Sequence, residues 1–211
     1  MRMRRKRRLN DRIERCEHLL IREPEKLFGR WLENYKFEKI YIELGCGKGL
    51  FTVETAKQNP DVLFIGIEKI SNVLVIALER ARQEGLQDVR FINGLADDIS
   101  TYFAPREVSR IYINFCDPWP ANRHKKRRMT GSLFLESYKQ VLCQGGEIHF
   151  KTDDMQLFEF SLSEFERIGF ALPDVTYDLH EKKPVGVMTD YEVKFHEQGM
   201  PIYMCVAQNE I

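Results

Sequence analysis

The sequence contains no long hydrophobic run and no CxxC cysteine pair. A membrane-spanning helix needs about 20 consecutive apolar residues, and no segment approaches that length. The five cysteines lack the spacing of a zinc site or a disulfide framework. The basic N-terminus is followed by no apolar segment, so it does not resemble a secretion signal. These absences favour a cytoplasmic protein without a membrane partner and without a bound metal.

The charges cancel over the whole chain but are unevenly distributed along it. Residues 1–8 hold six basic residues and residues 123–128 hold five more plus His124, and neither tract contains an acid. The remainder of the chain contains 21 basic and 32 acidic residues. Two basic tracts on an acidic body indicate a local contact with a polyanion. For residues 1–8 alone, a solvated surface is nearly as good an interpretation as a binding role.

Short apolar runs alternate with segments of helical spacing from residue 39 onward. This alternation predicts an α/β fold, a doubly wound and mostly parallel sheet with helices on both faces. In such sheets ligands bind beyond the carboxyl ends of the strands. A length of 211 residues suits one domain, taken as residues 36–211 after a basic arm and helical lead-in over 1–35. The predicted strands are 39–45, 62–68, 89–93, 110–117 and 146–153, with closing strands near 172–179 and 202–207, and the predicted helices are 49–59, 71–85, 133–142 and 155–168.

A glycine-rich loop follows the first predicted strand, in the order Glu43-Leu-Gly45-Cys-Gly47-Lys-Gly49. Alternating glycines let the backbone turn sharply and approach a ligand closely, but the spacing differs from the GxGxxG of dinucleotide sites. The Glu43 carboxylate would repel a pyrophosphate and attract the sulfonium and ammonium groups of S-adenosylmethionine. Glu68, which ends the second strand, could accept both ribose hydroxyls. Because NAD enzymes place an acid similarly, a nicotinamide-dependent oxidoreductase remains an alternative.

The most specific feature is Asn114-Phe-Cys-Asp117-Pro-Trp-Pro120, which five basic residues follow closely. Asp117 leaves a buried strand and enters a loop stiffened by two prolines. A rigid carboxylate and an aromatic side chain beside a phosphate-binding tract predict a site for a nucleic-acid base. Trp119 could stack on that base or cap the core, and Cys116 is interpreted as a packing residue.

These stretches resemble the tRNA (guanine-N7)-methyltransferase family, bacterial TrmB type. The resemblance implies a seven-stranded class I methyltransferase fold that uses S-adenosylmethionine and methylates guanine 46 in the variable loop of tRNA. Members of the family are monomers or homodimers. The stretches that carry the resemblance are Glu43–Gly49, Gly66-Ile-Glu68, Asp117-Pro-Trp-Pro120 with Arg123–Arg128, Phe150-Lys-Thr-Asp153, and Thr189-Asp-Tyr-Glu192-Val-Lys-Phe195.

The resemblance also implies three groups of site residues. Asp117 is the catalytic candidate. Family members usually carry an acid where this chain has Leu95, and a lysine where it has Ala121-Asn122. These departures keep open a non-catalytic RNA-binding protein on a methyltransferase scaffold. The cofactor group is Glu43, Gly45, Gly47, Gly49, Glu68, Leu95 and Asp117, and the substrate group is Asp153, Thr189, Asp190, Tyr191 and Glu192, with Arg123, His124, Lys125, Lys126, Arg127 and Arg128 at the RNA.

The chemistry of guanine N7 suits such a site. N7 carries an in-plane lone pair, so it can attack a methyl carbon without losing a proton, and no general base is required. Methylation moves positive charge onto the purine, where a nearby carboxylate stabilises it. Asp117 or Asp153 could also accept hydrogen bonds from guanine N1–H and N2–H, which adenine does not offer.

Overall fold

The computed structural model describes residues 8–182 and 186–210, so the basic residues 1–7 lie outside the described residues. Within the described part, eight strands form one sheet in the order β1-β4-β3-β2-β5-β6-β8-β7. β8 runs antiparallel to β6 and β7, and all other pairs are parallel. The strands are β1 (Leu20–Ile21), β2 (Lys39–Leu44), β3 (Val62–Ile67), β4 (Val89–Ile92), β5 (Val108–Asn114), β6 (Leu142–Thr152), β7 (Ala171–Thr176) and β8 (Tyr203–Gln208).

The predicted doubly wound sheet is confirmed, with one strand more than the seven expected. The extra strand is β1, which pairs with β4 at the sheet edge through Leu20 and Phe91. A strand of two residues is too short to show the alternation of side chains that predicts a strand, so the sequence pattern predicts a helical lead-in there. The lead-in is instead a series of short elements.

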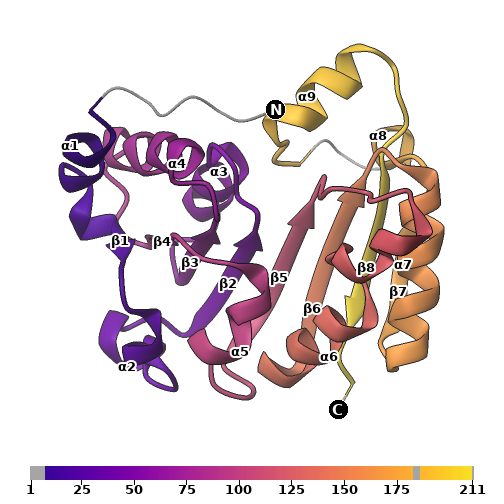
Figure 1. Cartoon of the computed structure of the whole chain (residues 1–211), viewed down its shortest axis with the longest axis horizontal. Helices are drawn as coiled ribbons and strands as arrows, with labels where there is room; N and C mark the ends of the chain where they lie inside the picture. Colours follow the sequence, from indigo (N-terminus) through magenta and orange to yellow (C-terminus); the bar gives the residue numbers. More distant parts are fainter. Residues whose placement is uncertain (1–7, 183–185, 211) are drawn as a thin grey trace.

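Nine α-helices surround the sheet in the described residues (Figure 1). The longest, α7, begins at a side-chain cap in which Leu157 N donates to Asp154 Oδ1, and it ends at Gly169, whose φ is +81°. The helices are α1 (Leu9–Glu14), α2 (Trp31–Tyr35), α3 (Leu50–Lys57), α4 (Ser71–Gln83), α5 (Ile99–Tyr102), α6 (Ser132–Val141), α7 (Met155–Ile168), α8 (Leu179–Lys182) and α9 (Asp190–Glu197).

Alternate side chains of the central strands pack into two hydrophobic cores on opposite faces of the sheet. Ile40 and Ile42 of β2 pack with residues of α2, α5, α6 and α7, whereas Tyr41 packs with residues of α3 and α4. Trp31 is fully buried in the first core, and its Nε1 donates to the Tyr102 carbonyl at 2.9 Å. The lead-in is thus tied to the sheet, and the division near residue 36 stays a prediction.

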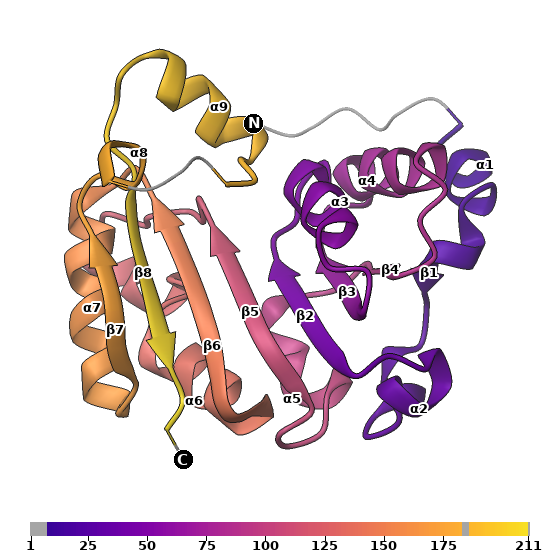
Figure 2. The ribbon, with the colours of Figure 1, turned by 180° about the vertical axis from the view of Figure 1, so that it is seen from behind.

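The carboxyl ends of β2, β5 and β6 point to one edge of the sheet, over which α8 and α9 lie (Figures 1 and 2). A small third core of Leu179, Ile202, Met204 and Val206, with Phe115 and Phe195 beside it, joins this C-terminal segment to β8. The candidate site is assembled at this edge. Among the described residues, none of the helices has both the length and the apolar character required to cross a bilayer.

Candidate functional site

The glycine turn after β2 has a backbone that side chains would obstruct. Gly45, Gly47 and Gly49 all have positive φ, at +75°, +57° and +75°, a region that residues with a Cβ rarely adopt. A Cβ on Gly49 would lie 2.5 Å from the Cβ of Ala77, so this glycine lets α3 pack on α4. A Cβ on Gly45 would meet nothing within 4 Å. The turn therefore packs against α4 at Gly49 and leaves free space at Gly45, as a ligand-binding loop requires.

Glu43 lies beneath this turn and is only 3% exposed. Its carboxylate accepts hydrogen bonds from Thr52 Oγ1 at 2.5 Å and from Asn114 Nδ2 at 3.0 Å. Burial raises the pKa of Glu43 to about 7, against the lowering effect of Thr52, Asn114 and the Lys151 ammonium. Glu43 thus ties β2 to α3 and β5 below the loop, and the described residues do not present it at the surface.

The raised pKa of Glu43 makes stability depend on pH. Because the folded pKa is above the unfolded value of 4.5, the stabilisation is complete below pH 4.5 and is lost as pH rises through about 7. A shift of this size corresponds to about 3 kcal/mol. We expect the free energy of unfolding of the wild type to fall relative to that of Glu43→Gln by about this amount over that pH range. Urea unfolding of both proteins at several pH values measures it, and parallel curves would contradict the assignment.

Glu68 follows β3 and is held against the glycine turn. It is 8% exposed, and its carboxylate accepts from Gly47 N at 3.2 Å and from Ile70 N at 2.8 Å. Asn93 Nδ2 donates to the Glu68 carbonyl at 2.8 Å, which links the ends of β3 and β4. Leu95, two residues further on, is 47% exposed. Three predicted cofactor elements therefore follow the neighbouring strands β2, β3 and β4. They are the glycine turn, Glu68 and Leu95.

Asp117 is exposed on the loop after β5, and this loop has an unusual backbone. Phe115 and Trp119, on either side of Asp117, have φ of +51° and +44°. Such angles are strained for bulky residues and persist only where the surroundings impose them. Arg128 braces the Trp119 side, because its Nε donates to the Pro118 carbonyl at 2.9 Å and its Nη2 to the Trp119 carbonyl at 3.3 Å. Asp117 is thus carried on a braced loop.

This position of Arg128 differs from the RNA contact that the sequence suggested. The side chain is 5% exposed and its guanidinium lies 4.4 Å from the centre of the Phe160 ring. Its charge supports the loop from inside, so Arg128 does not share the surface of its neighbours. The guanidinium of Arg127 lies 4.9 Å from the centre of the Trp119 ring. The exposed members of the tract, which lie on the 3-10 helix Asn122–Arg127, are Arg123, Lys125, Lys126 and Arg127, with His124 half-buried.

Thr189 and Glu192 form a capping box that begins α9. Glu192 N donates to Thr189 Oγ1 at 3.0 Å, and Thr189 N donates to Glu192 Oε2 at 3.4 Å. Glu192 is 1% exposed, and Lys151 Nζ donates to both its oxygens at 3.1 and 3.2 Å. His180 Nε2 lies 3.3 Å from Glu192 Oε1. In this structure Thr189 and Glu192 fasten α9 to the end of β6, and the Glu192 carboxylate is already engaged.

The other predicted substrate residues lie closer to the surface. Tyr191 is 64% exposed, and its ring stacks on Phe115 with centroids 6.4 Å apart and planes at 21°. Asp190 Oδ1 lies 3.9 Å from Arg80 Nη2 of α4. Asp153 is half-buried directly after β6. Through Phe115, two residues before Asp117, α9 presents an aromatic face beside the candidate catalytic loop.

Asn114 is a site residue to which the sequence motifs assign no role, whereas Lys151 belongs to the strand end Lys151-Thr-Asp153, for which a substrate role is expected. The two are register partners near the ends of β5 and β6, and the signal for Asn114 is available, since it is a polar residue that ends a buried strand. Asn114 Oδ1 is buried and has no hydrogen-bond partner among the described residues. The ammonium of S-adenosylmethionine would supply the missing donor. With the open turn at Gly45 for the methionine part and Glu68 for the ribose, the residues present fit this cofactor.

Cys116, next to Asp117, is unsuited to act as a nucleophile. Burial and the Asp117 carboxylate raise the pKa of its thiol to about 12, so the reactive thiolate is not formed near neutral pH. The earlier interpretation of Cys116 as a packing residue agrees with its contact with the first core.

The sheet order, the glycine turn after β2 and the acid after β3 define a class I methyltransferase that uses S-adenosylmethionine. The model of the methyltransferase family Methyltransf_4, which comprises tRNA guanine-N7 methyltransferases of the TrmB type, matches residues 38–205. The chain belongs to this family.

Solved structures share the fold at low sequence identity. The 16S rRNA methyltransferase KamB is 13% identical with a TM-score of 0.65, over 84% of this chain and 91% of that one. The 16S rRNA (adenine(1408)-N(1))-methyltransferase from Catenulisporales acidiphilia is 11% identical with a TM-score of 0.61, over 88% and 92%. A mutant of the latter, with SAM as cosubstrate, is also 11% identical, with a TM-score of 0.58 over 88% and 90%.

Proposed function

We propose that this protein transfers the methyl group of S-adenosylmethionine to N7 of guanine 46 in the variable loop of tRNA. The position of Asp117 carries the proposal. This carboxylate is exposed on a braced loop, three residues beyond Asn114, which bonds to Glu43 beneath the glycine turn. The exposed basic tract follows directly, and Tyr191 stacks on the preceding Phe115. A base held at Asp117 therefore has aromatic and cationic groups around it.

The proposed role of the site residues is to orient the target guanine and to stabilise the positive charge that develops on it. The bound cofactor supplies an electrophilic methyl group on a sulfonium, so the protein needs no base to activate N7. Asp117 accepts from guanine N1–H and N2–H and faces the positive charge that develops on the purine. Tyr191 and Trp119 supply π-faces for stacking. The exposed cations Arg123, Lys125, Lys126 and Arg127 neutralise the phosphates that flank the target, and Asp153 lies at the neighbouring strand end.

The departures at Leu95 and Ala121-Asn122 favour a second candidate, a non-catalytic RNA-binding protein. In that case the exposed Leu95 would weaken the binding of the adenine group of S-adenosylmethionine. RNA would then bind without being modified. The braced loop and the open glycine turn support catalysis, because RNA binding alone requires neither.

A methyl-transfer assay on unmodified tRNA tests the proposal. We expect labelled methyl from S-adenosylmethionine to enter tRNA, and nuclease digestion to recover it as N7-methylguanosine at position 46. The matched control is the same tRNA with adenine at position 46, which should accept none. Transfer to 16S rRNA alone would replace the proposed substrate. Tight tRNA binding without any transfer would favour the non-catalytic candidate.

A further inference from the structure

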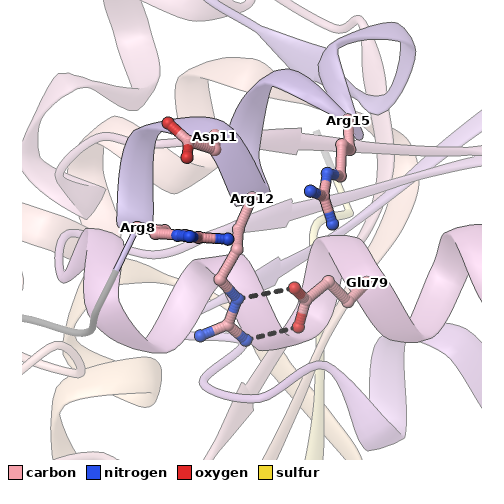
Figure 3. A pocket seen from close by; sticks show the side chains of 5 residues that line it. All are labelled: Arg8, Asp11, Arg12, Arg15 and Glu79. Carbon is pink, nitrogen blue, oxygen red and sulfur yellow. Dashed lines mark hydrogen bonds and ion pairs between the residues drawn. The ribbon is translucent and has the colours of Figure 1, made fainter.

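The face of α1 that packs on α4 carries an arginine pocket. Arg12 lies on α1, Arg8 directly precedes this helix and Arg15 directly follows it. Figure 3 shows their guanidinium groups directed toward the same space beside Glu79 of α4. These three arginines line the pocket with Glu79 and Asp11. We call this group of five residues the arginine pocket.

Within the arginine pocket, Arg12 and Glu79 neutralise each other. Arg12 Nε lies 2.7 Å from Glu79 Oε1, and Nη2 lies 2.5 Å from Oε2, a bidentate pair that fixes α1 to α4. Arg8 and Arg15 are exposed on either side of it. Among the residues that the structure describes, no ion pair joins Arg8 or Arg15 to a carboxylate. The pocket therefore offers two guanidinium groups to an outside anion. The Arg12–Glu79 pair fixes the helix segment that carries them.

Helix α4 connects the arginine pocket with elements of the candidate active site. Glu79 is followed by Arg80, whose Nη2 lies 3.9 Å from Asp190 at the start of α9. Two residues before Glu79, Ala77 packs against Gly49 of the glycine turn. One turn of α4 therefore connects the pocket with both the cofactor loop and the segment that bears Tyr191. Because α1 lies at the β1–β4 side of the sheet, only an extended nucleic acid with its base at Asp117 would also contact the pocket (Figure 1).

We propose that Arg8 and Arg15 bind a backbone phosphate of the RNA substrate, which extends the RNA contact from the 123–127 tract to α1. The proposal rests on the proposed RNA methylation. Guanidinium groups match phosphate oxygens in a planar, two-bond geometry and remain charged at any physiological pH. Two of them in one pocket, with the third arginine paired with Glu79, favour a phosphate as the ligand.

The test is the salt dependence of tRNA binding by Arg8→Ala/Arg15→Ala. Each lost phosphate contact reduces the slope of log Kd against log salt concentration by about 0.7 to 0.9. Because the two arginines share one phosphate, we expect the double variant to lose about 0.7 to 0.9 from that slope and to bind tRNA roughly 4- to 5-fold more weakly near 0.15 M salt. Arg8→Lys/Arg15→Lys should keep most of the slope. Binding of S-adenosylhomocysteine should be unchanged in both, because neither residue touches the cofactor loop.

A control variant removes the same charge elsewhere. Arg30 and Arg106 are exposed and precede the amino ends of β2 and β5, at the opposite edge of the sheet. Arg30→Ala/Arg106→Ala should leave the slope of the wild type intact. Equal losses in both double variants would mean that net charge alone acts, and would overturn the proposal.

A small free anion is the other source of the same chemistry, and a pyrophosphate titration separates the two. If pyrophosphate raises Tm of the wild type but not of Arg8→Ala/Arg15→Ala, while the tRNA slopes are equal, the pocket binds free anions and the proposal is wrong. A reduced slope without N7-methylguanosine in the transfer assay would retain the RNA contact and reject the proposed methylation. The two proposals therefore fail separately.

Discussion

Replacing Asp117 with alanine is expected to lower kcat of methyl transfer by about 10²- to 10³-fold, the usual effect of removing one preorganised electrostatic group from a transition state. The carboxylate stabilises positive charge that reaches the purine only as the new N–C bond forms, so kcat should fall more than the affinity for tRNA. Single-turnover rates and tRNA binding constants, measured side by side, check this.

Two further variants sharpen the interpretation of Asp117. Asp117→Asn keeps the size of the side chain and removes its charge, so it should resemble Asp117→Ala if charge stabilisation dominates, and retain more activity if orientation dominates. Asp61→Asn removes an exposed carboxylate before the amino end of β3 and should behave as wild type. Full activity of Asp117→Ala with tRNA would contradict the role of Asp117 as the catalytic residue.

The fold class could be predicted because buried strands leave local signals in the sequence. Buried parallel strands are continuous apolar runs in the sequence. The strands predicted at 39–45 and 62–68 agree with β2 and β3 to within one residue at each end. The spacing predicts the glycine turn, and positive φ at Gly45, Gly47 and Gly49 explains why those positions favour glycine. β1 left no signal because two residues show no period.

The burial of charged side chains could not be predicted from the sequence. Arg128 reads as the last member of an exposed basic tract, yet it turns inward to the Pro118 and Trp119 carbonyls. Glu192 reads as a free acid in a substrate motif, and only the packing of α9 shows that Lys151 engages it. Both outcomes depend on partners distant in the chain or on backbone carbonyls that sequence patterns do not reveal.

Replacing Lys151 with methionine should release α9 and destabilise the protein by about 3 kcal/mol, because breaking a buried ion pair leaves an uncompensated charge. Lys151 is 14% exposed at its side chain and Glu192 is 1% exposed, so water cannot readily replace the lost ammonium. Urea unfolding measures the loss. Hydrogen exchange should localise it, with α9 amides exchanging faster and those of β2 and β3 little changed.

Removing both charges distinguishes a broken pair from lost packing. In Lys151→Met/Glu192→Gln no buried charge remains, and a neutral side chain at 192 can still accept from Thr189 N, so most of the lost stability should return. The activity should not return fully, because α9 would be held without the pair that joins it to β6 beside Asn114. Equal stability of the single and double variants would show that packing of the Lys151 stem, and not its charge, holds α9 over the site.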